Sequence, residues 1–335
     1  MLREIFGDEK CMLLDLFITH YDEAWEIGKK NFDILALQQS VDWNAVRVTL
    51  VHDGTEPFPD EYFAGYPYKV TQVELPHGGI AAARNWCIDH STATWIKWCD
   101  FDDTFASIFA LEELMNAMRN GQNFDLLWFK LVLEKDGKWY KKEERDPVVI
   151  HGKAFRRSFL ISHNVRFPEY LTWCEDSAFL ARLELEIDHS RIGEIQTMGP
   201  MYMFVVRQGS LCNRKEIWFS NRKSFFLRHQ YVEDQLREHG DLVGARMMVV
   251  RIMGDSYFTL HEVNASTPEE REEHERAVWE YFKQKKDDFL MVSKADFDMA
   301  LAAVNRESES VNYISKEDVL RWIKELRQKY EGGDE

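Results

Sequence analysis

Apolar, strand-like runs alternate with helical segments through the first 120 residues of this 335-residue chain. The strand-like runs are residues 11–19, 46–51, 70–75 and 95–99. The helical segments are residues 22–38, 78–88 and 109–118. Strands that alternate with helices predict a layered α/β domain with a mainly parallel sheet. We expect such a sheet to bind its ligands at the carboxyl ends of its strands.

Three acids stand directly after the fourth of these runs. Asp100, Asp102 and Asp103 follow Trp95–Cys99, and Asp53 follows the second run at the same predicted edge of the sheet. Clustered carboxylates repel one another unless a cation lies among them. Oxygen ligands with no adjacent cysteine or histidine favour Mg²⁺ or Mn²⁺, which commonly bind phosphate oxygens as well. The alternative interpretation is a polar turn after a buried strand.

The pattern changes after residue 120. Strand-like residues 124–133 and 138–141 flank an Asp-Gly pair, which predicts a hairpin. Residues 153–162 and 175–187 have helical spacing, and residues 201–206 form a strand-like run. From residue 214 onward the pattern is helical, with helix starts at Thr267-Pro268 and at Ser315. We therefore predict an α/β domain over residues 1–213 and a helical region over residues 214–335.

The composition restricts the classes of partner. The net charge of −16 argues against binding that depends on neutralising a nucleic-acid backbone or an anionic membrane. The five cysteines form no Cys-x-x-Cys pair, which favours free thiols in a reducing compartment. No apolar run has the length that would span a membrane, and the first residues lack a signal-peptide pattern. These features predict a cytoplasmic protein without an integral membrane segment.

Seven short segments occur in order between residues 12 and 214. They are residues 19–22 (THYD), 52–55 (HDGT), 78–85 (GGIAAARN), 100–103 (DFDD), 152–157 (GKAFRR), 175–176 (ED) and 207–210 (RQGS). In this order they resemble the family 2 glycosyltransferases, which have the GT-A fold and use nucleotide-diphosphate sugars. The resemblance implies a nucleotide-sugar half at about residues 1–120 and an acceptor half at about 121–213. His52 stands where the family commonly has an acid, so the sequence leaves the identity of the donor's nucleobase undecided. A UDP-sugar is the favoured donor.

The resemblance assigns the Asp100–Asp103 segment to the family's D-x-D motif. It implies that Asp102 binds Mn²⁺ or Mg²⁺ directly. It implies that Asp100 contacts the ribose, the ion or a water bound to the ion. Asp103 is expected either to contact the donor sugar or to cap a following helix, with Thr104 as a rival cap.

The same resemblance implies further donor contacts. Asp53 is expected to accept hydrogen bonds from the nucleobase or the ribose, or else to be a turn residue. Arg84 either reaches the base, braces the acidic cluster or is a solvated helix arginine. Thr19 and Tyr21 close the other side of the pocket, where the tyrosine ring could stack on the base. Arg207 suits the diphosphate through bidentate hydrogen bonds.

An acceptor hydroxyl needs a general base, and the family's "E-D" pair points to Asp176. Glu175 would position the acceptor. Adjacent helix residues diverge by about 100°, so we expect the two side chains to point in different directions. One base acting in a single displacement predicts inversion at the anomeric carbon. Many GT-A enzymes add a late histidine to the metal site, but none stands between His189 and His229. We therefore expect water in that place, or no further ligand.

Two other functions fit parts of the sequence. Residues 100–104 satisfy the D-x-D-x-T motif of haloacid-dehalogenase phosphatases, with Asp100 as nucleophile, although at least two strands precede the motif here. A catalytically inactive carbohydrate- or protein-binding domain is the second alternative. The sequence does not identify the acceptor: a glycan, a lipid-linked sugar, a protein and a modified nucleobase all fit. The C-terminal helices either form a homodimer contact or cap the acceptor groove.

Overall fold

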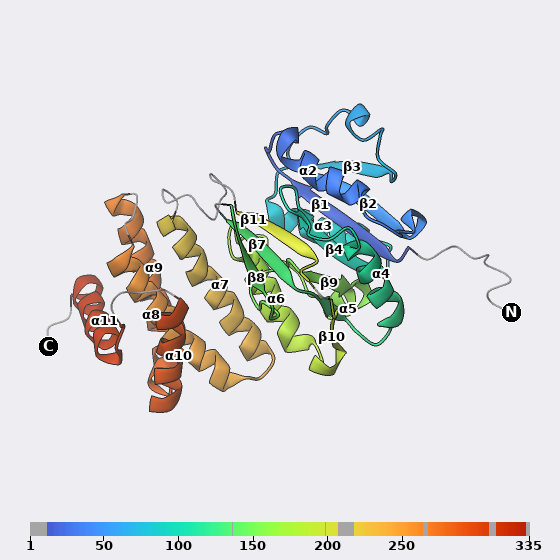
Figure 1. Ribbon diagram of the computed structural model, residues 1–335. Coiled ribbons are helices and arrows are strands. Elements are labelled where there is room, and N and C mark those ends of the chain that lie inside the picture. Colours follow the sequence, from blue (N-terminus) through green and yellow to red (C-terminus); the bar gives the residue numbers. More distant parts are fainter. Residues whose placement is uncertain are drawn as a thin grey trace. The chain divides into compact units, whose positions relative to one another are not determined.

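The computed structural model describes residues 12–135, 137–197, 199–206, 218–263, 267–307 and 313–332 (Figure 1). The chain divides into two compact units, Met1–Gln208 and Gly209–Glu335. The predicted boundary at residue 213 falls outside the described residues and stays a prediction.

The first unit is built on a seven-stranded sheet of order β10-β6-β9-β4-β1-β2-β3. Its strands are β1 (Leu14–His20), β2 (Val46–Asp53), β3 (Val70–Leu75), β4 (Trp95–Asp100), β6 (Leu126–Trp128), β9 (Lys153–Arg156) and β10 (Ile192–Glu194). β1 pairs in parallel with β2 and β4, and β2 pairs in parallel with β3. The predicted layered α/β fold with a mainly parallel sheet is confirmed.

Helices cover both faces of this sheet, because alternate residues of its central strands are apolar on each side (Figure 1). On β1, Leu16 and Ile18 pack on one side, while Phe17 packs on the other. The helices of this unit are α2 (Trp25–Ala36), α3 (Ile80–His90), α4 (Ala110–Asn120), α5 (Arg157–Ser162) and α6 (Glu175–Glu186). α2 and α4 share the core of the first side, and α3, α5 and α6 share the core of the second. Three short 3-10 helices, Trp43–Ala45, Asp60–Tyr62 and His189–Arg191, complete the unit.

A second, four-stranded sheet of the same unit has the order β5-β11-β7-β8. Its strands are β5 (Thr104–Phe105), β7 (Leu131–Lys135), β8 (Lys138–Lys142) and β11 (Tyr202–Val206). The predicted hairpin is present as the antiparallel pair β7–β8. The expectation of one strand over residues 124–133 was wrong, because β6 and β7 divide this segment between the two sheets.

The expected helix over residues 153–162 was also partly wrong. Its first four residues form β9, which is antiparallel to both β4 and β6, and only Arg157–Ser162 is helical. Lys153, Ala154 and Phe155 are all buried, so the segment is an interior strand and not an amphipathic surface helix.

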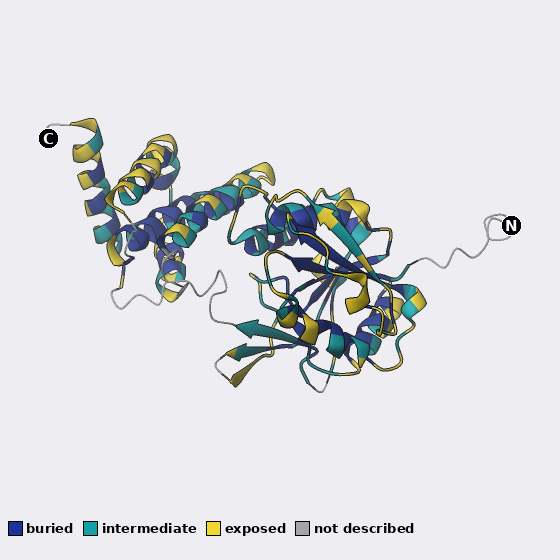
Figure 2. Cartoon of the chain, turned by 90° about the horizontal axis from the view of Figure 1, so that it is seen from above, coloured by how far each residue is buried: buried dark blue, intermediate teal, exposed yellow. Residues whose placement is uncertain are grey.

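The second unit is helical, as the sequence indicates. Its helices are α7 (Trp218–Glu238), α8 (Leu242–Glu262), α9 (Pro268–Leu290), α10 (Lys294–Glu307) and α11 (Lys316–Glu331). The expected helix starts are present, since Thr267 caps α9 and Ser315 forms a capping box with Asp318. Buried side chains of α8 form much of the shared core, and exposed residues occupy the outer sides of the helices (Figure 2). Within the described ranges, no helix has both the length and the apolar character that crossing a membrane requires.

Candidate active site

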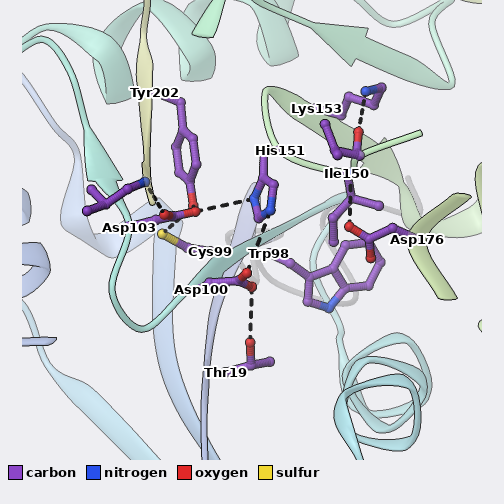
Figure 3. A network of polar contacts seen from close by, with 12 residues as sticks. Thr19, Trp98, Cys99, Asp100, Asp103, Ile150, His151, Lys153, Asp176 and Tyr202 are labelled. Atoms are coloured by element: carbon purple, nitrogen blue, oxygen red, sulfur yellow. Dashed lines mark hydrogen bonds and ion pairs between the residues drawn. The ribbon is translucent and has the colours of Figure 1, made fainter. Parts of the chain in front are cut away.

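The carboxyl ends of neighbouring strands bring distant side chains together. β1 and β4 pair so that Thr19 lies opposite Asp100. The Thr19 hydroxyl oxygen Oγ1 lies 3.5 Å from Asp100 Oδ1 (Figure 3). Asp53 ends β2, the next strand on the other side of β1. The predicted edge of the sheet therefore carries these polar side chains together.

His151 lies between two of the acids, a position that the sequence did not indicate. Its Nε2 is 3.6 Å from Asp100 Oδ2, and its Nδ1 is 3.4 Å from Asp103 Oδ2 (Figure 3). The imidazole is buried and stacks on Tyr202, with ring centroids 5.8 Å apart. The one available signal was its position directly before the 152–157 segment. β9 follows immediately and inserts beside β4, which carries His151 to the acids.

Asp103 is an interior residue. Tyr202 donates its hydroxyl hydrogen to Asp103 Oδ2 at 2.9 Å, and the backbone N–H of Val205 donates to Oδ1 at 2.9 Å. Burial and the neighbouring Asp100 and Asp102 hold the pKa of this carboxyl well above its usual range. The alternative that Asp103 caps a helix was wrong, because β5 follows it. The predicted contact of Asp103 with the donor sugar stays a prediction.

Asp100, Asp103 and His151 form a group that can hold a metal ion. One ligand atom from each lies within 4.8 Å of the others. Two carboxylates and one imidazole suit Mn²⁺ or Mg²⁺ better than a thiolate-seeking metal. Among the described residues this group does not include Asp102, which is partly exposed. The role of Asp102 as direct ligand stays a prediction.

Arg84 braces the acidic residues from α3. Its Nη2 donates to Asp100 Oδ1 at 3.0 Å, and its Nη1 donates to Glu175 Oε1 at 2.8 Å and also contacts Asp176 Oδ1. The guanidinium is buried, so it is not a solvated helix arginine. Burial alone would lower the pKa of Arg84, but Asp176, Asp100 and Glu175 together keep it above its ordinary value.

Glu175 and Asp176 begin α6 and reach the same nitrogen of Arg84. The expectation that they point in different directions was wrong, because Arg84 lies where both side chains can bend toward it. The backbone N–H of Ile150 also donates to Asp176 Oδ2 at 3.3 Å. Burial and the adjacent Asp176 raise the pKa of Glu175 to about 8. The raised pKa favours the protonated form of Glu175.

Asp53 fixes the loop that leads into α3. Its Oδ1 accepts from the N–H of Gly78 at 2.8 Å, its Oδ2 accepts from the N–H of Gly79 at 3.0 Å, and His77 Nδ1 lies 3.0 Å from Oδ2. The Tyr21 ring stacks on His77, with centroids 4.7 Å apart. Tyr21 is 52% exposed. Contacts of Asp53 and Tyr21 with a nucleobase stay predictions.

His52, the departure from the family pattern, pairs with a second histidine. His52 Nδ1 lies 2.9 Å from His20 Nδ1, and the two residues are opposite one another on β2 and β1. His52 Nε2 lies 3.0 Å from Gln72 Oε1, and His20 Nε2 lies 2.9 Å from the carbonyl oxygen of Glu23. Burial and the charge of His20 lower the pKa of His52 to about 4.

One predicted donor contact cannot be placed. Arg207 lies outside the described residues, so its predicted contact with the diphosphate stays a prediction.

The sequence and the fold both have known counterparts. The model of the family described as "Glycosyl transferase family 2" matches residues 16–174. S. aureus TarS 1–349 in complex with UDP is similar in structure, with a TM-score of 0.60 and 15% identity over 96% of this chain and 92% of that chain. S. aureus TarS 1–349 in complex with UDP-GlcNAc has a TM-score of 0.52 and 16% identity over 88% of this chain and 92% of that chain. No curated protein matches the sequence.

Proposed function

Residues 16–174 are a glycosyl transferase family 2 domain, and we propose that this enzyme moves a sugar from a nucleotide-diphosphate sugar, with a UDP-sugar favoured, to an acceptor hydroxyl. The phosphatase alternative was therefore wrong. UDP and UDP-GlcNAc are bound in the TarS structures, which supports the choice of nucleotide. The observation that carries the proposal is the single buried guanidinium of Arg84, which joins the strand-end acid Asp100 to the Glu175-Asp176 pair.

A divalent ion, Mn²⁺ or Mg²⁺, fits the group formed by Asp100, Asp103 and His151. The donor set is the observation that supports this fit. His151 directs Nε2 toward Asp100, while Asp103 lies beside Nδ1 and is itself fixed by Tyr202. With an ion at Nε2, Asp103 would orient the imidazole from its Nδ1 side, as a carboxylate commonly does for a metal-binding histidine, so the proposed ligands from this group are Asp100 and His151. When bound, the ion would offset the negative charge that develops on the departing diphosphate. Asp102 is the further ligand that we propose.

Asp176 is the proposed general base. Glu175, whose pKa is raised to about 8, favours its protonated form and is left to position the acceptor. Arg84 contacts Asp176 and links it to Asp100, so these two side chains are held relative to one another before substrate binds. Such preorganisation in a buried site stabilises developing charge at little cost in reorganisation.

The proposed reaction is a single displacement. Asp176 accepts the proton of the acceptor hydroxyl while that oxygen forms a bond to the anomeric carbon. The bond between the anomeric carbon and the diphosphate oxygen breaks, and its electron pair leaves with the nucleotide diphosphate. Because one base acts on one face of the sugar, the configuration inverts. NMR of the product that showed retention would contradict the role of Asp176.

The donor pocket is proposed at the ends of β1 and β2. Thr19 lies beside Asp100, and Tyr21 and Asp53 both contact His77. We propose that Tyr21 stacks on the base, that Asp53 contacts the base or ribose, and that Arg207 binds the diphosphate. Residues 1–120 would then serve the donor and residues 121–213 the acceptor. A cytoplasmic location and a homodimer through the C-terminal helices stay predictions.

A panel of UDP-, GDP- and TDP-sugars with Mn²⁺, read as donor hydrolysis, tests this proposal and identifies base and sugar together. We expect one UDP-sugar to be hydrolysed and the activity to fall on removal of the ion. Thermal protection by UDP only in the presence of Mn²⁺ distinguishes an intact donor site from an inactive domain. Absence of both hydrolysis and protection across the panel would contradict the proposal.

A further inference from the structure

A row of apolar side chains crosses the second sheet, starting at the candidate metal site. The His151 ring lies 4.9 Å from that of Phe204 on β11. Phe204 pairs with Leu133 on β7, and Leu133 pairs with Tyr140 on β8. Directly paired residues lie on the same face of a sheet. The row from Phe204 to Tyr140 therefore spans two inter-strand spacings, or about 10 Å.

The outer end of this row is open to solvent. β8 is exposed at every position (Figure 2). Tyr140 is 49% exposed. Leu133 and Phe204 are half-buried. Adjoining exposed apolar side chains commonly mark a binding surface.

Lysines flank the row on the same face. Lys135 pairs with Lys138 on one side of it, two residues along from Leu133 and Tyr140. Lys142, which pairs with Leu131, lies on the other side and forms an ion pair with Asp146. No acidic side chain of the described residues lies within ion-pair distance of Lys135 or Lys138. In a chain with a net charge of −16, this face is a local positive strip.

We propose that this face, formed by Phe204, Leu133, Tyr140 and the flanking Lys135 and Lys138, is the acceptor surface and that it takes an acidic glycan. Aromatic and aliphatic side chains pack against the C–H faces of sugar rings, and the lysines attract the anionic substituents. The row ends at His151, beside Asp100, so a glycan that lies along it presents its terminal hydroxyl to the candidate site. This inference rests on the proposed function and specifies its acceptor.

The opposite face of the same hairpin supplies matched controls. Trp139 pairs with Glu134, and Lys141 pairs with Val132, so both side chains lie on the other face. Trp139 is 68% exposed, and Lys141 is exposed as well. A hairpin that binds any polyanion or an anionic membrane through its overall charge would use both faces. An acceptor surface that leads to His151 uses only the face that carries Leu133 and Tyr140.

The experiment measures binding of oligogalacturonate, an acidic glycan, to the full chain without donor, with the methyl ester of the same glycan as the uncharged comparison. We expect Tyr140→Ala to weaken binding about fivefold. We expect the double variant Lys135→Gln/Lys138→Gln to weaken it about tenfold and to reduce its salt dependence. Trp139→Ala and Lys141→Gln should leave the affinity unchanged, and the methyl ester should bind more weakly than the acid.

Equal losses from substitutions on the two faces, or equal binding of the acid and the ester, would overturn the proposal. Tighter binding to duplex DNA or to phosphatidylglycerol vesicles than to the glycan would also overturn it, and would assign the hairpin to those partners. Donor hydrolysis by the unaltered chain is measured separately. A chain that hydrolyses its donor but shows no difference between the faces would retain the proposed function and lose this acceptor surface.

Discussion

Asp100 at the end of β4 and Asp176 in the first turn of α6 are held by the two terminal nitrogens of one guanidinium, that of Arg84. The carboxylates of Asp100 and Asp176 and the carboxyl group of Glu175 share this one buried cation. The arrangement links the candidate metal site to the candidate base through one side chain. It also makes the site dependent on a single residue of α3, which gives the first prediction.

Arg84→Met should destabilise the fold, because it leaves the carboxylates of Asp100 and Asp176 and the carboxyl group of Glu175 without their cation. Removing one partner from a buried ion pair costs about 3–5 kcal/mol in the free energy of unfolding. Arg84→Lys should recover part of this loss, since it restores the charge without the planar fork. Urea unfolding measures both, with Arg119→Met on the exposed surface of α4 as the control. If Arg84→Met lowered the free energy of unfolding by less than about 1 kcal/mol, the network would contribute little to the stability of the fold.

Substitutions of Asp176 and Glu175, the two acids that begin α6, should have different effects on kcat. Asp176→Asn should lower kcat by about 100- to 10,000-fold, because a positioned general base supplies an effect of that size. Glu175→Gln should retain most of kcat, since Gln resembles the protonated form that the raised pKa favours. Steady-state rates of sugar transfer at pH 7 test this. If Glu175→Gln lowered kcat as much as Asp176→Asn does, the roles proposed for these two residues would have to be exchanged.

Glu175 also predicts a dependence of stability on pH. Its pKa is about 8 in the folded chain and about 4.3 in an unfolded one, so the folded state holds the extra proton between these values. The contribution of this group is therefore complete below about pH 4 and is lost as the pH rises to about 8. Relative to the unaltered chain, Glu175→Gln should gain stability over this range, by about 1–3 kcal/mol. Urea unfolding at a series of pH values measures the difference, and a constant difference would contradict the raised pKa.

The histidine pair predicts the opposite sign at lower pH. The pKa of His52 is about 4 in the folded chain and about 6.5 in an unfolded one. The folded state binds fewer protons than the unfolded state between these values. The contribution of His52 to the free energy of unfolding is therefore complete above about pH 6.5 and is lost as the pH drops toward 4. His52→Gln should flatten this part of the curve, while His90→Gln on the exposed end of α3 should not. If the free energy of unfolding of His52→Gln fell with pH as steeply as that of the unaltered chain, the loss of stability in acid would belong to other groups.

The metal group predicts a graded loss of ion affinity. His151→Ala removes a proposed ligand, and Asp103→Asn removes the carboxyl that orients it. Loss of such an orienting partner commonly costs about 10–100-fold in metal affinity. Titration with Mn²⁺ followed by electron paramagnetic resonance, without nucleotide, measures the affinity of each variant. Equal affinities in His151→Ala and the unaltered chain would remove His151 from the site, and Asp102→Asn then becomes the decisive variant.

The central sheet could be predicted from the sequence because its signals are local. Each buried strand and each following helix has its own periodicity, and acids at strand ends indicate the edge that carries the site. The hairpin at β7–β8 had an Asp-Gly turn to indicate it. The caps of α9 and α11 are likewise set by residues within one turn.

The parts that sequence reasoning missed depend on tertiary contacts. β9 is a four-residue strand placed antiparallel between β4 and β6, and its pattern resembles the start of an amphipathic helix. That placement brings His151 close to Asp100. Glu175 and Asp176 meet at one atom because Arg84, from α3, lies between them. Asp103 is held in the interior by Tyr202, a residue 99 positions away.

The most direct test of the account is anomalous diffraction at the manganese edge from crystals grown with Mn²⁺ and UDP. We predict one anomalous peak within bonding distance of Asp100 Oδ2 and His151 Nε2, with the diphosphate of UDP against it. A peak elsewhere in the chain, or UDP bound without any ion near these two side chains, would contradict the account.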